Sequence, residues 1–173
     1  VDDSTRPERA APFPIRSLIF SPLPDDDVIS MGGTLLRLVD QGHEVHVAYQ
    51  TSGNIAVFDD DVLRHLEFAR QILSDDPAQS KLDAWIDKVE STINLKKTGD
   101  IDPPEIQNFK GIIRRTEALA ACRYCGVEME HAHFLDLPFY ETGTIKKNPI
   151  GPADVQIIYD LLERVKPNQI FAA

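Results

Sequence analysis

A strand, a helix and a second strand follow one another early in the chain, and this order restricts the fold more than any other feature. Residues 15–20 (IRSLIF) form a short apolar run between prolines, which is typical of a buried strand, and residues 45–50 (VHVAYQ) alternate like a second strand. Between them, a helix is expected to begin near Gly32 and Gly33 and to end at Gly42. Strands joined through helices in this way predict an α/β fold with a mostly parallel sheet.

The rest of the chain continues this alternation. Apolar residues at helical spacing predict helices within residues 62–73, 82–93, 105–125 and 155–165, and short strands are expected at residues 133–135 and 169–172. The pattern implies a Rossmann-like sheet with helices on both faces and a helical insertion after the second strand. Ligands bind such sheets beyond the carboxyl ends of the strands, so the PDDD and TSGN segments after the first two strands are expected to line the active site.

Length and composition indicate one globular domain. The chain has 173 residues, of which 42% are hydrophobic and 27% charged, close to the averages for folded proteins. Residues 1–14 contain prolines and no apolar period, and we interpret them as a linker-like segment that precedes a domain at residues 15–173.

The charge balance and the hydropathy pattern exclude two classes of partner. Eighteen Lys and Arg against 28 Asp and Glu give a net charge of −10, which disfavours binding to nucleic acid. No apolar run reaches the roughly 20 residues that cross a bilayer, and the first residues lack the apolar core of a signal peptide. We therefore expect a cytoplasmic protein with no membrane partner.

The sequence contains two cysteines, Cys122 and Cys125, which lie three residues apart within a predicted helix. This spacing is compatible with a redox or zinc pair, but no second pair accompanies it. Packed, reduced thiols are the more common outcome for such residues. His131 with His133, and His43 with His46, are the other candidate ligand pairs, and a locally hydrogen-bonded histidine is again the more common alternative.

Three adjacent carboxylates, Asp25, Asp26 and Asp27, follow the first predicted strand. Like charges repel, so such a cluster needs solvent, a cation or a helix amino terminus to neutralise it. A solvated acidic turn that caps the helix satisfies this condition, and so does a metal site. The Gly-Gly-Thr that follows and the later Thr51-Ser52-Gly53-Asn54 favour a functional site.

The segment from Ser21 to Thr34, S-P-L-P-D-D-D-x-x-x-x-G-G-T, resembles the LmbE/PIG-L family of zinc-dependent N-acetylglucosaminyl deacetylases. Further matches to the family are Gln41-Gly42-His43-Glu44-Val45, Thr51-Ser52-Gly53, Arg114-x-x-Glu117, Gly126-Val127 and residues 133–138 (HFLDLP). The resemblance covers about residues 15–173, with the helical insertion near residues 76–104. Residues 29–61 are similar, more narrowly, to the version found behind glucosamine-6-phosphate deaminase in two-domain bacterial chains.

The resemblance implies a hydrolase that uses zinc to remove an N-acetyl group from an amino sugar of the N-acetylglucosamine type. Because the family motif is His-Pro-Asp-Asp, Asp25 is assigned as the general base and Asp26 as a zinc ligand. Leu23 occupies the position of the first zinc histidine, and the resemblance places the last one beyond Ala173, which implies a domain truncated at its carboxyl-terminal end. A degenerate, non-catalytic domain that binds an amino sugar or another protein domain is the alternative.

The resemblance also implies roles for loop residues and for partners. A sugar hydroxyl or phosphate is assigned to the segment Thr51, Ser52, Gly53 and Asn54, for which a plain turn is the alternative. An anionic group of the substrate is assigned to Arg114 or Arg115, for which an exposed ion pair with Glu117 is the alternative. Residues 139–142, after the third predicted strand, suit either stacking on a sugar ring or packing. The candidate partners are a small amino sugar, a fused or associated glucosamine-6-phosphate deaminase domain and a second copy of the chain.

Overall fold

The computed structural model describes residues 13–73, 79–97 and 99–173. Most of the segment interpreted as linker-like, residues 1–14, therefore lies outside the described residues. The chain divides into two compact units, which are described separately below. Of the described residues, the sheet unit contains 13–52, 115–142 and 146–173, and the helical unit contains those within 53–114 and 143–145.

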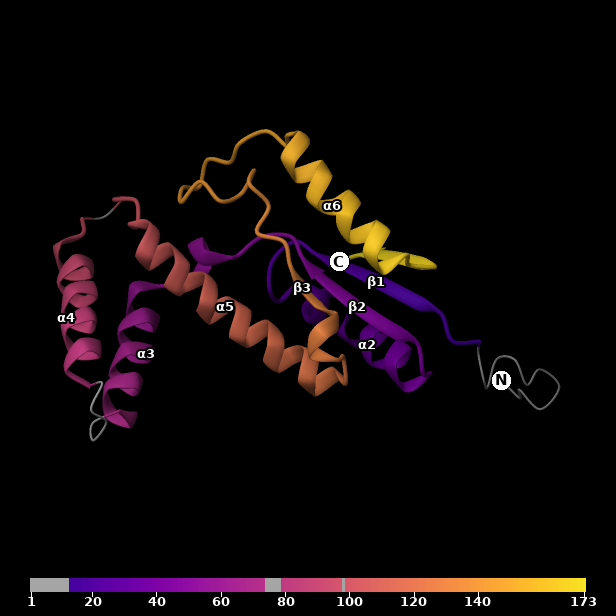
Figure 1. Ribbon diagram of the computed structural model, residues 1–173, viewed down its shortest axis with the longest axis horizontal. Helices are drawn as coiled ribbons and strands as arrows, with labels where there is room; N and C mark the ends of the chain where they lie inside the picture. Colours follow the sequence, from indigo (N-terminus) through magenta and orange to yellow (C-terminus); the bar gives the residue numbers. More distant parts are fainter. Residues whose placement is uncertain (1–12, 74–78, 98) are drawn as a thin grey trace. The chain divides into compact units, whose positions relative to one another are not determined.

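The sheet unit is built on a four-stranded, all-parallel sheet with the strand order β3-β2-β1-β4 (Figure 1). Its strands are β1 (Arg16–Ser21), β2 (Glu44–Tyr49), β3 (Ala132–Phe134) and β4 (Gln169–Ala172). The predicted parallel sheet of an α/β fold is thus confirmed. The chain proceeds from β1 outward to β2 and β3 and then returns to β4 on the other side of β1, so the strand order reverses beside β1. Sheets of this type bind ligands where the order reverses, at the carboxyl ends of the strands.

Helices cover both faces of this sheet, as the sequence predicts. They are α2 (Asp26–Asp40), α6 (Pro152–Val165) and the part of α5 (Pro104–Cys125) that begins at Arg115. Ile19 and Val47 pack in one core with α2 and α5. Leu18 and Ala48, one residue away on the same strands, pack in a second core with α6. The period of two along each strand therefore places α2 and α6 on opposite faces, as Figure 1 shows.

Helix α2 begins at Asp26, so the prediction that it begins near Gly32 and Gly33 is wrong. Asp25 is its N-cap residue, and Asp26 and Asp27 lie in its first turn, where the helix dipole stabilises negative charge. This stabilisation extends the helix towards β1 and leaves both glycines in the helix interior. The predicted end of the helix is confirmed, because Gly42 follows it with a φ of +78°.

The helical unit has a hydrophobic core of its own. It contains η1 (Asn54–Ala56), α3 (Asp59–Ile72), α4 (Gln79–Leu95) and the first part of α5. Its core is formed by Val57, Val62, Leu66, Ile86, Val89, Ile93, Ile106 and Ile113. The predicted helical insertion after the second strand is thus confirmed. Next to this core, the nearly buried Lys110 forms ion pairs with Asp59 and Asp102, both at 2.7 Å.

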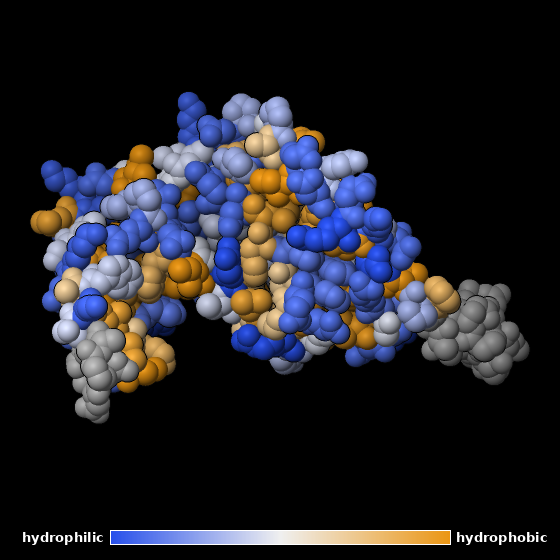
Figure 2. Space-filling view, in the orientation of Figure 1, coloured by the Kyte–Doolittle hydropathy of each residue, from blue (hydrophilic) through white to orange (hydrophobic). Residues whose placement is uncertain are grey.

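The surface of α6 illustrates how the helices meet solvent. Leu161 and Val165 point inward, and Figure 2 shows mostly hydrophilic side chains over the outward face of the helix. Such a division is typical of a helix that packs on a sheet in water. Among the described residues, no helix combines the length and the apolar character that crossing a membrane requires.

Candidate active site

The turn after β1 carries the three adjacent carboxylates to the carboxyl-terminal edge of the sheet. Ser21 Oγ donates to the Leu23 carbonyl oxygen at 2.6 Å and accepts from the Asp27 backbone N–H at 2.9 Å. The Asp26 carboxylate accepts from the Leu23 backbone N–H at 2.9 Å. These short-range bonds close the turn on itself and fix where α2 begins.

The three carboxylates occupy different environments. Asp27 is 1% exposed and accepts a hydrogen bond from the Tyr49 hydroxyl at 3.0 Å. Burial raises the pKa of the Asp27 carboxyl, and the hydrogen bond from Tyr49 opposes this increase. Asp25, the N-cap residue, and Asp26 are half-buried. Of the three, Asp25 and Asp26 are therefore more accessible than Asp27, which holds the turn to β2.

The hydroxyl of Tyr49 also lies 3.2 Å from Cys122 Sγ, inside the core that faces α2. Cys122 and Cys125 are both buried and not disulfide-bonded, which confirms the prediction of packed thiols. Burial raises the pKa of each thiol and that of the Tyr49 hydroxyl. Neither cysteine is therefore activated as a nucleophile.

Thr51 and Ser52, which follow β2, connect three loops at this edge. Thr51 Oγ1 donates to the Pro22 carbonyl oxygen at 2.8 Å, which ties the loop after β2 to the loop after β1. The backbone N–H and the Oγ of Ser52 each donate to one carboxylate oxygen of Glu141 at 2.9 Å. Glu141 lies in the loop after β3, which the sequence marks for sugar stacking or packing, but its bond to Ser52 was missed because no local pattern reports it.

A hollow of about 250 Å³ opens beside the same edge. It is lined by Gln50 after β2, by Leu137 and Phe139 after β3, and by Asp154 and Ile158 of α6. The buried Asp154 accepts from the backbone N–H groups of Gly151 at 2.7 Å and Phe139 at 2.9 Å, so it holds the wall of the hollow. A concave, mainly apolar surface with few polar groups is typical of small-molecule sites.

The donor atoms at this edge do not complete the zinc site that the family resemblance implies. The Leu23 side chain has no lone pair to offer, and the Asp26 carboxylate is already bonded to the backbone of Leu23. Across the described ranges, the residues that lie close enough to share one metal ion are Glu44, His46 and His131, and none of these belongs to the loop after β1. A single carboxylate would hold zinc weakly.

The candidate histidine pairs lie at the opposite, amino-terminal edge of the sheet. His46 is near the start of β2, His131 ends the short helix η2 (Met129–His131), and His133 lies in β3. His43 precedes β2, and its Nδ1 accepts from the Ile15 backbone N–H at 3.1 Å. Burial lowers the pKa of His46 and lowers that of His133 to about 4, so both rings are neutral near pH 7.

Three of the predicted substrate-binding residues, Gly53, Asn54 and Arg114, belong to the helical unit. Gly53 adopts a φ of +66° before η1, a conformation that favours glycine. Arg115, in the sheet unit, donates to Asp136 at 2.9 Å. The roles assigned from the sequence stay predictions for all of the following residues: Asp25, Asp26, Thr51, Ser52, Gly53, Asn54 and Arg114.

Comparison with known proteins shows the ancestry of the chain. Residues 18–173 match the model of the PIG-L family, described as GlcNAc-PI de-N-acetylase. The chain belongs to the PIG-L family. The predicted resemblance is thus confirmed, and membership of the PIG-L family supports a deacetylase-type function on N-acetylglucosamine-like substrates in a family that is generally metal-dependent.

A curated relative of this PIG-L chain comes from Bacteroides thetaiotaomicron and is named a glucosamine-6-phosphate deaminase-like protein. The two sequences are 56% identical over 177 residues, which is 99% of this chain and 26% of the relative. The chain therefore spans about a quarter of the length of the curated relative that it matches. No solved structure matches it.

Proposed function

We propose that this PIG-L chain hydrolyses the N-acetyl amide of an amino sugar of the N-acetylglucosamine type. The observation that carries the proposal is the position of Asp25 and Asp26 at the carboxyl edge of the sheet, beside the reversal of strand order, in a chain matched to the de-N-acetylase family over residues 18–173. In this reaction water adds to the amide carbonyl, the C–N bond breaks, and acetate and the free amine leave.

At the carboxyl edge of the sheet, one residue transfers protons and others shape the binding surface. Asp25, half-buried at the start of α2, accepts the proton of the attacking water and passes it to the leaving amine. Thr51 and Ser52 shape the adjoining wall, because their hydroxyls connect the loops after β1, β2 and β3. The apolar hollow next to them offers Phe139 as a surface for the sugar ring. No metal-dependent step is included, because the described residues do not complete a metal site there.

We place this activity within a longer protein. The chain matches about a quarter of a relative whose name refers to glucosamine-6-phosphate deaminase. Removal of acetate from a phosphorylated N-acetylamino sugar yields an amino sugar phosphate, which is the class of compound that a neighbouring deaminase would consume. The cytoplasmic location expected from the sequence belongs to the same proposal.

Release of acetate tests the proposal. The purified chain is incubated with N-acetylglucosamine or its 6-phosphate, with and without added zinc, and acetate is followed by proton NMR. We expect acetate and free amine in equal amounts, and a decrease of about 10²- to 10⁴-fold for Asp25→Asn. Asp40→Asn, at the exposed far end of the same helix, is the matched control and retains activity.

The Leu23→His variant separates catalysis from binding. It adds an imidazole two residues before Asp25, at the position where the family has a zinc ligand, and we expect more zinc per chain and faster acetate release. If neither the chain nor this variant releases acetate while NMR shows that the sugar still binds, the deacetylase proposal is overturned. The Leu23 side chain would then mark a non-catalytic amino-sugar-binding domain.

A further inference from the structure

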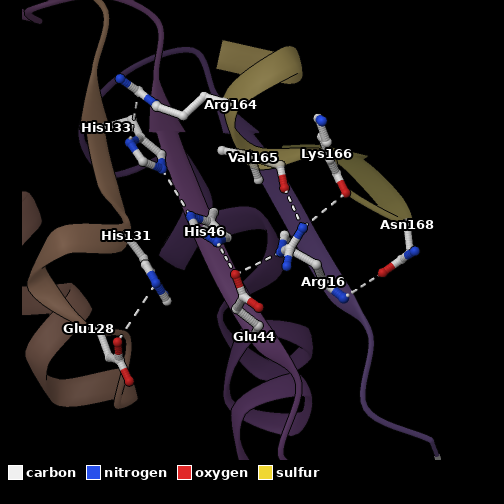
Figure 3. Close-up of polar contacts among 10 residues, drawn as sticks. All are labelled: Arg16, Glu44, His46, Glu128, His131, His133, Arg164, Val165, Lys166 and Asn168. Carbon is white, nitrogen blue, oxygen red and sulfur yellow. Dashed lines mark hydrogen bonds and ion pairs between the residues drawn. The ribbon is translucent and has the colours of Figure 1, made fainter.

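A second group of polar side chains gathers at the amino-terminal edge of the sheet (Figure 3). Side chains two residues apart on a strand point to the same face, so Glu44 and His46 share one face of β2. Arg16 is paired with Glu44 across the sheet, and His133 is paired with Ala48, which packs against α6. The strand register thus collects these side chains on the α6 face of the sheet.

The contacts within this group are short. His46 Nε2 lies 3.0 Å from Glu44 Oε1, and His46 Nδ1 lies 3.0 Å from His133 Nε2. The ring centroids of His46 and His131 lie 3.9 Å apart, with the two ring planes inclined by 32°. One ligand atom from each of Glu44, His46 and His131 lies within 4.8 Å of the other two, a separation that a single metal ion can bridge.

The donor set selects one class of ion. Two imidazole nitrogens and one carboxylate oxygen suit zinc and neighbouring divalent transition metals, whereas magnesium and calcium prefer oxygen ligands alone. We propose that Glu44, His46 and His131 bind a divalent transition-metal ion of the zinc type. Three protein ligands leave a coordination position for water or for a small ligand. Glu44 and His46 also line a hollow of about 450 Å³ in which such a ligand can lie.

The surroundings of the three ligands orient them. When His46 binds the ion through Nε2, its Nδ1–H donates to His133 Nε2. A neutral His133 then carries its proton on Nδ1, so the Arg164 guanidinium must turn away from its 3.4 Å contact with that nitrogen. Arg16 Nε donates to Glu44 Oε1 at 2.7 Å, and another nitrogen of the same guanidinium donates to the Val165 carbonyl oxygen at 2.8 Å. The carboxylate is therefore held by an anchored arginine, and its second oxygen, Oε2, takes part in neither this bond nor the contact with His46.

The charges near the cluster are compatible with a bound cation. Arg16 and Arg164 are the cationic groups that line the hollow, and Glu44 and Glu130 line it as well. The carboxylate of Glu128 lies 3.7 Å from His131 Nε2 and adds a third negative charge. The neighbouring carboxylates thus outnumber the guanidinium groups, which favours a positive ion.

This site is separate from the edge where the family motif lies. Glu44 begins β2, whereas Asp26 lies in the first turn of α2 at the carboxyl edge of the sheet, and six residues of strand span roughly 16 Å. One ion cannot reach both places. Glu44-x-His46 and His131-x-His133 are the sequence signals for the cluster, and Glu44 was missed as a candidate because only histidines were paired in the sequence.

Metal binding to the purified chain tests the proposal. The protein is treated with chelator and dialysed against Zn²⁺ or Co²⁺, and bound metal is measured by elemental analysis and by the visible spectrum of Co²⁺. We expect one ion per chain, and an affinity at least about tenfold lower for Glu44→Gln and His131→Gln. His133→Gln, which removes an orienting partner, should weaken binding by about 10- to 100-fold.

Two control variants locate the ion. His65→Gln removes a histidine of the helical unit, and Asp26→Asn alters the carboxyl edge, so both should bind metal like the unmodified chain. Far-ultraviolet circular dichroism checks that every variant is folded, and the isosteric Glu44→Gln remains informative if a histidine variant is not. The proposal is overturned if the chain binds no metal, or if Asp26→Asn abolishes binding while Glu44→Gln and His131→Gln leave it unchanged.

Discussion

The Tyr49 hydroxyl donates to Asp27 Oδ2 at 3.0 Å, and these two side chains are 0% and 1% exposed. The bond joins the end of β2 to the first turn of α2. A buried carboxylate that loses such a donor leaves its desolvation uncompensated, which is costly. The position of the candidate active-site turn therefore depends on a tyrosine of the neighbouring strand.

Tyr49→Phe is expected to lower the free energy of unfolding by about 1–3 kcal/mol, because it removes the hydroxyl that pairs with the buried Asp27. Urea unfolding followed by circular dichroism measures the change. Tyr124→Phe is the matched control, since Tyr124 is 85% exposed on α5 and should be neutral. Equal stability of the two variants would contradict this role of the hydroxyl.

Lys110→Met is expected to lower the free energy of unfolding by about 1–3 kcal/mol, because the carboxylates of Asp59 and Asp102 each lose a close partner. Thermal unfolding of both variant and unmodified chain measures the effect. Lys81→Met, at an exposed position of α4, serves for comparison and should change little. Lys96 also forms ion pairs with Asp59 and Asp102. A Lys110 variant as stable as the Lys81 variant would show that Lys96 alone satisfies both carboxylates.

Asp154 should make stability depend on pH. The backbone N–H groups of Gly151 and Phe139 lower the pKa of its carboxyl, so the stabilisation is present at neutral pH and is lost as the pH falls through this lowered value. We expect Asp154→Asn to be less stable than the unmodified chain at pH 7, with the difference shrinking in acid. Urea midpoints between pH 7 and pH 3 measure it, and Asp160→Asn, on the exposed face of α6, is the matched control. A difference that stays constant with pH would refute the assignment.

The two thiols should be protected in the folded chain. Cys122 and Cys125 are buried and burial raises the pKa of both, so little reactive thiolate is exposed. A chromogenic disulfide reagent should react slowly with the native protein and rapidly with both cysteines in denaturant. Fast reaction of the native chain would mean that the core between α2 and α5 opens readily.

Much of the fold could be predicted from the sequence because its local patterns agree with the tertiary packing. The apolar run at residues 15–20 and the alternation at residues 45–50 became β1 and β2, and the glycine at position 42 ended α2. The start of α2 was missed because Gly32 and Gly33 suggested a loop. The three aspartates before them stabilise the helix amino terminus more than two glycines disfavour its interior.

The candidate site was less accessible to sequence reasoning, because its contacts join residues far apart in the chain. Ser52 and Glu141 are 89 residues apart, and their bond depends on β2 and β3 being neighbours. The pairing of His46 with His133 likewise spans 87 residues. Residue types and spacing suggested ligands in both regions, but strand order and register decide which ones meet.

Alternate side chains of β2 point to opposite faces of the sheet. A single strand register therefore places both the core residues and the residues of the amino-terminal cluster. Val45, Val47 and Tyr49 face the core with α2, so Glu44 and His46 must face α6. A slip of β2 by one residue would turn Glu44 and His46 into the hydrophobic core with α2 and turn the valines towards the α6 face, so burial of the valines in the α2 core fixes the register. The valines that face the core thus determine where the imidazole rings lie on the other face. A mutation that loosens the packing of these valines would first become visible as heterogeneity at the histidines.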